Sequence, residues 1–205
     1  MIITKNKIQT KLRAATHSYH VSINQHPLLH GLTTREYPLA NYRVLLVAYF
    51  HLFEILEMRV TAFLEKSTVP FDYSKRTKLS WIQDDLDYFN ENPKTESNLP
   101  SSPVDFPQIN SVGQLIGVLY SIEGSTLGGQ VISQNLDLNH NLSITNGARF
   151  FSGYADNTEV QWREFCRFAE SIQNDEEQCK FAEASAILTF NKFHEILNEY
   201  YRSRC

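Results

Sequence analysis

The sequence predicts an all-α fold built as one domain over residues 1–205. Three observations support this prediction. Apolar residues recur at spacings of three and four along most of the chain, which is the period of an amphipathic helix. No segment shows the strict apolar and polar alternation of a half-buried strand. A length of 205 residues suits a single domain with a substantial core, so we expect one compact bundle of helices.

The individual elements follow from this periodicity and from the residues that interrupt it. Pro27 stops the first helix, and a threonine at position 33 or 34 caps the second. The segment 92–107 combines prolines with Ser and Asn and indicates a surface loop, and the Asn-rich segment 135–146 indicates a connection. The predicted helices cover about residues 5–24, 33–66, 74–89, 111–133, 158–172 and 175–201.

Composition excludes several classes of function. The formal net charge is −4 and the pI is about 6.0, so no broad basic surface is present and we expect no nucleic-acid partner. No stretch of about 18 apolar residues occurs, so we expect no membrane span. The three cysteines have no CxxC spacing, and the first residues lack the apolar segment of a secretory signal. Both features favour a cytoplasmic protein with reduced thiols.

Five of the eight glycines fall between positions 113 and 129, inside a segment that is otherwise helical. Each glycine costs a helix about 1 kcal/mol relative to alanine, so five cost about 5 kcal/mol, which approaches the stability of a small domain. The first four are separated by four, seven and four residues and therefore share one helical face. This bare face admits either a broad, flat ligand or another helix backbone. Gly113 and Gly117 suit the packing role even where the later glycines line a site.

The first predicted helix carries a second pattern. Thr16 and His20 are four residues apart, so they lie on one helical face. Arg13 and His17 occupy the neighbouring edge, one turn apart, where they are suited to anionic groups. A neutral imidazole that points from a helix into an apolar crevice is a suitable axial ligand for an iron porphyrin.

Two other interpretations of these histidines stay open at this point. His20 also suits a core or rim position in which its ring bonds to a backbone carbonyl. His17 and His20, joined by Glu54 or Glu57 of the second helix, are an alternative metal site, because such a site needs a carboxylate or a third histidine nearby.

Two segments resemble one known family. Residues 12–20 (LRAATHSYH) are similar to the LRxxTxxxH signature of heme oxygenases, and residues 124–131 (GSTLGGQV) resemble their glycine-rich distal helix. Residues 120–132 and 32–57 are most similar to the bacterial branch that accompanies bacteriophytochromes. The likeness covers about residues 8–132, with weaker support toward the C-terminus. It implies a single heme-oxygenase-like helical bundle.

The resemblance also implies roles for individual residues. His20 would be the axial ligand of the heme iron, and the distal helix would bend over the heme face at Gly124, Gly128 and Gly129. Ser125 stands where many family members have an aspartate that holds distal water, so proton delivery would rely on other groups. The resemblance places Arg13, His17 and Lys192 at the heme propionates and Phe193 against the heme plane. It places Thr16 beside the axial ligand, and Glu123 and Thr126 at the distal water.

The implied activity is cleavage of heme, as both substrate and cofactor, by O2 and reducing equivalents to biliverdin, CO and iron. The chain has no GxGxxG fingerprint, so we expect electrons from a separate ferredoxin or reductase, with a bacteriophytochrome as acceptor of biliverdin. One alternative is a heme carrier or sensor without turnover, which Ser125 favours. Another is a di-metal oxidase or a thiaminase-like enzyme of the same helical architecture.

Overall fold

The computed structural model of the chain describes residues 7–34 and 36–203. The prediction of an all-α fold is confirmed, since the only β pairing within these residues is a pair of isolated bridges at Ser143. Lys5, where the sequence predicts the first helix to begin, lies outside the described residues. The helices are α1 (Lys7–Asn24), α2 (Leu39–Leu64), α3 (Leu79–Tyr88), α4 (Val112–His140), α5 (Arg149–Ser152), α6 (Thr158–Ala169) and α7 (Glu176–Arg202), with short 3-10 segments at Glu96–Asn98, Ala155–Asn157 and Glu170–Ile172.

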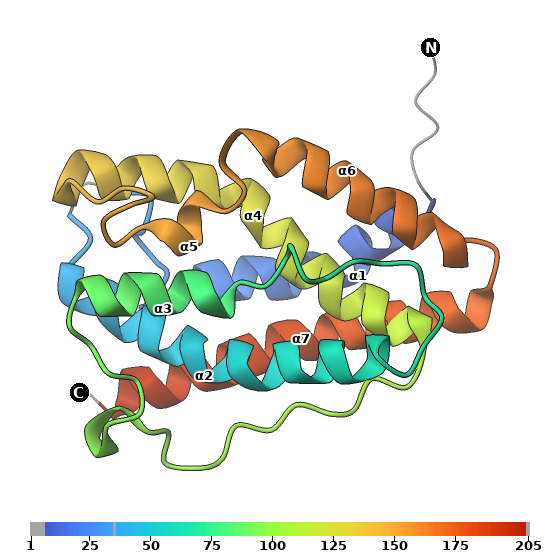
Figure 1. The fold of residues 1–205 in the computed structure, drawn as a ribbon, viewed down its shortest axis with the longest axis horizontal. Coiled ribbons are helices and arrows are strands. Elements are labelled where there is room, and N and C mark those ends of the chain that lie inside the picture. The colour runs from blue at the N-terminus through green and yellow to red at the C-terminus, as the bar shows by residue number, and fades with distance from the viewer. Residues whose placement is uncertain (1–6, 35, 204–205) are drawn as a thin grey trace.

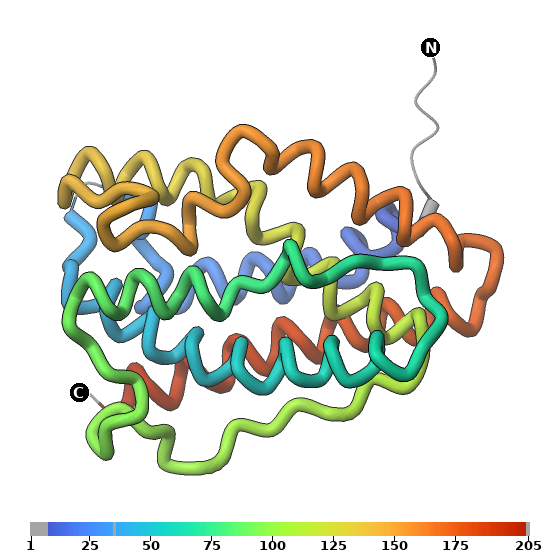
Figure 2. The backbone as a smooth tube through the Cα atoms, viewed as in Figure 1, coloured from blue at the N-terminus to red at the C-terminus, as the bar shows by residue number. Residues whose placement is uncertain are grey.

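Helix α4 is the central element of the bundle (Figure 1). It packs chiefly along α7 and also contacts α6 and α5, whereas α1 packs on α7 and α2 packs on α3 and α7. Direct contact between α1 and α4 is slight. Figure 2 shows that the path of α4 changes direction partway along the helix. The N-terminal part of α4 therefore faces α7, while its C-terminal part diverges from that helix.

The second helix begins later than the sequence predicts. It starts at Leu39, and Pro38 occupies the N-cap position with φ −68°. Thr34 does not cap this helix, because its hydroxyl donates to the carbonyl of Gly31 in a preceding turn. A proline restricts the residue before it to extended conformations, so the helix cannot extend back through this position.

The third helix also begins late, for a different reason. It starts at Leu79 rather than Ser74, because a side chain from α2 ends the preceding loop. Glu57 Oε1 accepts hydrogen bonds from the backbone N–H of Lys78 (2.5 Å) and of Leu79 (3.3 Å). A carboxylate at this position satisfies first-turn N–H groups that have no partner within the helix.

Helix α4 continues past the predicted boundary at residue 133. It ends at His140, where Asn141 adopts the left-handed conformation (φ 53°) and caps the helix. Leu136 is buried within this extension, so an apolar contact holds the Asn-rich segment in the helix. The prediction of a connection over 135–146 is therefore wrong for its first half. The sequence also does not predict the single turn of α5.

The described residues share one hydrophobic core, rich in aromatic side chains of α2, α5 and α7. None of the described helices has both the length and the apolar character needed to cross a membrane.

Candidate functional site

His20 is an accessible histidine near the end of α1. Its ring is exposed and meets Phe190 of α7 edge-on, with 6.0 Å between the ring centroids. Asn24, one turn further along α1, places its amide nitrogen 3.3 Å from His20 Nδ1. Partial burial lowers the pKa of His20, and the neighbouring His17 lowers it further. The imidazole is therefore neutral at pH 7, and Nε2 is the nitrogen left for a ligand.

The C-terminal part of α4 presents an unusually bare surface. A Cβ atom added at Gly128 would meet no heavy atom within 4 Å, and one added at Gly124 would meet only the Trp162 ring, at 3.7 Å. Leu127 and Val131 flank Gly128 and are 41% and 51% exposed. Open space beside a glycine and exposed apolar neighbours together form a surface suited to a flat apolar ligand.

The other glycines of α4 serve helix packing. Added Cβ atoms at Gly113 and Gly117 would lie 2.2 Å from the carbonyl oxygens of Gln178 and Ala182 in α7. The predicted packing role of these two glycines is confirmed. Gly129 differs from its expected place over a ligand, because a Cβ there would lie 2.6 Å from the carbonyl oxygen of Phe151 in α5. Glycine is thus required at three positions for close approach of backbones.

The remaining candidates on α1 separate into exposed and buried groups. Arg13 and His17 are exposed, as a contact with anionic groups requires. Thr16 is buried, and its hydroxyl donates to the carbonyl of Leu12 at 2.8 Å, so it does not face an open site. Tyr120 of α4 lies close to Thr16 and Arg13: burial raises the pKa of Tyr120, and those two side chains partly offset the rise.

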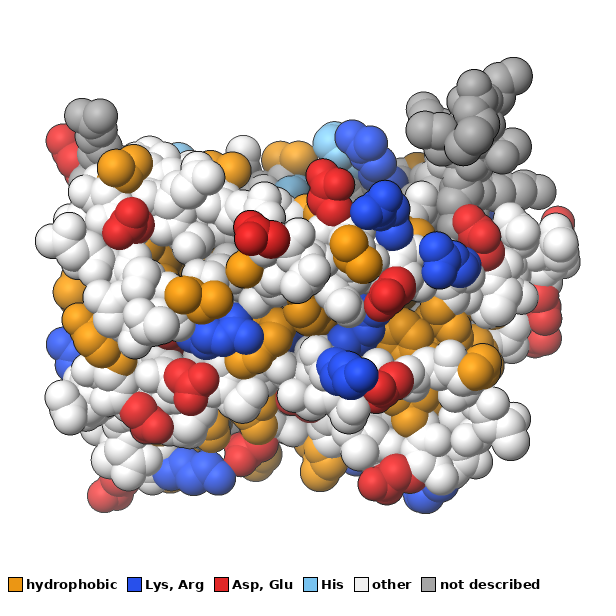
Figure 3. Space-filling view, turned by 45° about the horizontal axis from the view of Figure 1, so that its top comes forward, with side chains coloured by type: hydrophobic (Ala, Val, Ile, Leu, Met, Phe, Trp, Pro, Cys, Tyr) orange, Lys and Arg blue, Asp and Glu red, His pale blue; other side chains and the backbone are white. Residues whose placement is uncertain are grey.

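An open cleft of about 1190 Å³ lies away from His20, between the loop before α3 and the starts of α4 and α7. Figure 3 shows apolar side chains gathered in a recess with basic and acidic side chains around it. Phe71 and Phe168 stack in its wall, with 4.5 Å between their centroids. Among the described residues that line this cleft there is no histidine or cysteine, so it offers no imidazole or thiolate for a heme iron.

The alternative metal sites do not assemble in the part of the chain that the structure describes. No group of three His, Cys, Asp or Glu side chains there is placed to hold a metal ion. Glu54 pairs with Lys94 at 2.9 Å, and Glu57 caps α3. Cys179 is buried and its thiol lies 3.3 Å from the carbonyl of Ile172, so it offers no exposed nucleophile for thiaminase-like chemistry.

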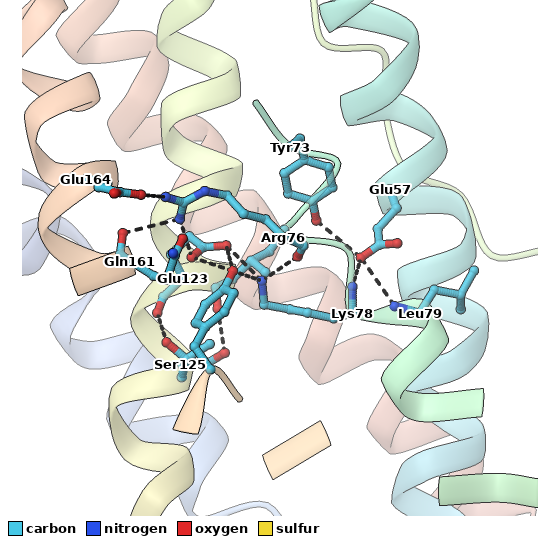
Figure 4. Close-up of polar contacts among 12 residues, drawn as sticks. Glu57, Tyr73, Arg76, Lys78, Leu79, Glu123, Ser125, Gln161 and Glu164 are labelled. Atoms are coloured by element: carbon cyan, nitrogen blue, oxygen red, sulfur yellow. Dashed lines mark hydrogen bonds and ion pairs between the residues drawn. The ribbon is translucent and has the colours of Figure 1, made fainter. Parts of the chain in front are cut away.

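Glu123 lies in a buried ionic cluster rather than beside the bare surface of α4 (Figure 4). Its side chain is 0% exposed and pairs with Arg76 at 2.9 Å and with Lys78 at 2.8 Å. The hydroxyl of Tyr154 lies 3.0 Å from both carboxylate oxygens. This arrangement contradicts the expected contact of Glu123 with distal water, because its oxygens are already engaged and enclosed.

Three further predicted residues have mixed outcomes. Ser125 is exposed, and its hydroxyl donates to the carbonyl of Ile122 at 2.7 Å. Phe193 is buried in the aromatic core, so it does not lie at His20; Phe190, one turn earlier, occupies that place. Helical spacing alone does not distinguish these two phenylalanines, so the sequence does not single out Phe190. Lys192 is partly exposed and pairs with Glu195 at 2.9 Å.

An accessible histidine on α1 and a side-chain-poor face on α4 are features expected of a helical protein that binds an iron porphyrin. Comparison with known families agrees with this class. The family model described as Heme oxygenase matches residues 6–199, so the chain belongs to the heme oxygenase family. It is an enzyme of this type, with heme as its iron-containing substrate and O2 as co-substrate.

Solved structures show the same fold at low sequence identity. One is the NO- and CO-bound heme oxygenase of Neisseria meningitidis, with a TM-score of 0.73 and 19% identity over 95% of this chain and 92% of that chain. Another is the heme oxygenase of Leptospira interrogans, with a TM-score of 0.74 and 16% identity over 94% of this chain and 99% of that chain. No curated protein matches the chain by sequence.

Proposed function

We propose that this enzyme degrades heme to biliverdin, CO and iron with His20 as the axial ligand and the α4 surface around Gly124 and Gly128 above the opposite heme face. The observation that supports this most strongly is the open space at Gly128, on a helix that has little direct contact with the helix of His20. When bound, the heme supplies the redox chemistry, while the protein binds and orients it.

On the His20 side, the chain controls the tautomer and the ring orientation. A metal-ligating imidazole must offer an unprotonated nitrogen, and the other nitrogen then carries the proton. Asn24 is placed to accept a hydrogen bond from Nδ1–H through its amide oxygen, once the amide is turned about its last bond. Phe190 limits rotation of the ring. The lowered pKa of His20 keeps protons from competing with iron at neutral pH.

On the α4 side, the absence of a side chain at Gly128 lets the helix backbone approach a flat ring. Leu127 and Val131 would cover this face of the ring and exclude water from part of it. Ser125 is the exposed hydroxyl in this segment, and we assign it the role of holding the water through which protons arrive.

Basic side chains would set the in-plane orientation of the heme. Arg13 and His17 are exposed on α1, and we assign Arg13 the stronger contact with a heme propionate because its guanidinium is always charged. Lys192 would serve as a second contact only after leaving Glu195, with which it pairs at 2.9 Å. This pair is a partly exposed one, so releasing it costs little.

We further propose that a separate ferredoxin or reductase in the cytoplasm supplies the electrons and that a bacteriophytochrome accepts the biliverdin. The likeness of residues 120–132 to the bacteriophytochrome-associated branch supports the second part. Mixing the reaction product with an apo-bacteriophytochrome tests it: covalent assembly with a red-absorbing spectrum is expected, and failure to assemble contradicts it.

The test of the function is product analysis. The hemin complex is reduced under O2 with ascorbate or with a ferredoxin system, in the presence of catalase so that free peroxide does not attack the heme. We expect loss of the Soret band, release of CO and chromatographic recovery of biliverdin. A Soret band that persists through repeated additions of reductant would show a heme carrier without turnover.

Gly128→Leu tests the proposed placement of the heme. A leucine in the open space should block heme binding, while the apo protein should fold as the wild type does because no neighbour is displaced. Unchanged heme affinity and an unchanged product would refute this placement.

A further inference from the structure

The ionic cluster at Glu123 joins α4 to three other parts of the fold. Arg76 and Lys78 come from the loop between α2 and α3, and Tyr154 comes from the segment after α5. Arg76 also donates to the carbonyl of Gln161 at 3.2 Å and pairs with Glu164 at 3.0 Å, so α6 is connected through the same guanidinium. One carboxylate of α4 therefore holds the helix to the α2–α3 loop, to the α5 region and to α6 (Figure 4).

Burial makes this connection strong and specific. The side chains of Glu123 and Lys78 are 0% and 1% exposed, and that of Arg76 is 4% exposed. Desolvation lowers the pKa of Lys78, and Glu123 opposes this effect. Removing one partner from such a group leaves the others as buried charges without compensation, which is strongly unfavourable. The cluster thus resists any movement of α4 that would lengthen its contacts.

The cluster affects the candidate heme site because of its position along α4. Glu123 immediately precedes Gly124, and Gly128 and Gly129 follow within the next two turns. Glycines permit backbone conformations that other residues do not, so this stretch of helix is locally compliant. Gly129 packs on the backbone of Phe151, but an added Cβ would meet only Trp162 at Gly124 and nothing at Gly128, so packing restrains this face of the helix only in part.

We propose that Glu123 is a positioning residue, which fixes the bare surface of α4 relative to His20 by anchoring the helix where its glycines begin. Functional groups must be held within about 0.5 Å of the productive geometry, and rigid support behind them supplies that restraint. The inference rests on the proposed placement of heme against this surface. Through it, Glu123 would restrict which edge of the heme is cleaved, without touching the heme.

The chain provides a matched control in Glu57. It is also a buried carboxylate, and it bonds to the backbone of Lys78 and to the Tyr73 hydroxyl at 3.2 Å. It holds α2 to the start of α3, and its hydrogen bonds to Tyr73, Lys78 and Leu79 involve no residue of α4. A general loss of stability would follow from changing either acid, whereas a local effect on α4 would follow from changing Glu123.

The experiment compares Glu123→Gln with Glu57→Gln by hydrogen exchange of the apo protein. We expect amides 124–131 to exchange at least about tenfold faster in Glu123→Gln, relative to the core of α7, and to keep wild-type rates in Glu57→Gln. Equal acceleration in both variants, or none at 124–131, would overturn the proposal. If Glu123→Gln does not fold, Tyr154→Phe removes the shared hydroxyl without leaving an unpaired charge, and the same comparison applies.

A second readout uses the heme complex. Wild type and Glu57→Gln should give the same distribution of biliverdin isomers, and Glu123→Gln should give a broader one. An unchanged distribution in Glu123→Gln contradicts the positioning role. A wild type that binds no heme would instead contradict the proposed function, and the exchange measurement would still decide whether Glu123 anchors α4.

Discussion

At the scale of single residues, the seven histidines of the chain differ in what surrounds them. His20 combines an exposed ring, an aromatic neighbour and a partner at Nδ1 only. A metal ligand needs this combination, since one nitrogen must be held and the other accessible. Four of the other histidines bond to backbone or side-chain groups, namely His26, His51, His140 and His194. The remaining two, His17 and His30, are exposed but lack this combination of neighbours.

The role of Asn24 leads to a direct prediction. Asn24→Ala should weaken hemin binding by about tenfold, because partners of ligating histidines contribute about 10- to 100-fold to metal affinity. The free energy of unfolding of the apo protein should change by less than about 0.5 kcal/mol, as expected for an exposed site. Spectroscopic titration measures the first and urea unfolding the second. Gln25→Ala, an exposed neighbour, is the control; equal affinities in all three proteins would contradict the role.

The sequence predicts some site residues and not others for a physical reason. His20, Arg13 and His17 belong to one short helix, so their relative placement follows from the helical period. The surroundings of Glu123 depend on Arg76 and Lys78, which precede it by 47 and 45 residues. Nothing in local spacing indicates which distant cations a carboxylate will meet, and so its burial could not be anticipated.

At the scale of elements, α4 uses its glycines in two ways. In its N-terminal part, Gly113 and Gly117 let the α7 backbone approach. In its C-terminal part, Gly128 faces open space and has no packing partner within 4 Å of an added Cβ. The same residue type on one helical face therefore supports the core at one end of the helix and leaves room for a ligand at the other.

Alanine substitutions at Gly117 and Gly128 should have opposite effects on the apo protein. Gly117→Ala should lower the free energy of unfolding by about 1–3 kcal/mol, because its Cβ would lie 2.2 Å from the Ala182 oxygen. Gly128→Ala should raise it by up to about 1 kcal/mol through helix propensity alone. Urea unfolding monitored by circular dichroism measures both. Destabilisation by Gly128→Ala would show that this position is packed.

Element boundaries show what the sequence could not specify. The helical period correctly predicts α1, α6 and α7, where local signals agree with the fold. The end of α4 depends on the burial of Leu136, and the start of α3 depends on the carboxylate of Glu57 from another helix. Tertiary contacts therefore move boundaries that composition would place elsewhere.

At the scale of the whole molecule, the fold is retained at 16–19% identity to solved heme oxygenases. This agrees with a bundle whose pattern of apolar positions, rather than individual residues, determines the architecture. The buried polar groups, rather than the apolar pattern, are then the features that are specific to this chain. They include the Glu123 cluster and a buried histidine, His26, which packs near His194 of α7.

His26 predicts a pH dependence of stability. Burial lowers the pKa of His26, His194 lowers it further, and Asn198 partly offsets the change. Protonation of His26 therefore favours the unfolded chain. The stability that neutral His26 contributes is fully present above pH 6.5 and is lost as pH falls through the folded-state pKa. Apo wild type should lose stability in urea between pH 7 and 5, and His26→Asn should flatten this slope. His30→Asn, an exposed control, should keep it; identical slopes in all three would contradict the prediction.

If His20 binds the heme iron, the coordination of hemin must change in His20→Ala. Wild-type protein should give the absorption and electron paramagnetic resonance spectra of an imidazole-ligated ferric heme. His20→Ala should lose that coordination, and added free imidazole should restore it, because the substitution leaves a space where the ring was. Imidazole-type coordination that persists in His20→Ala without added imidazole would show that His20 is not the iron ligand.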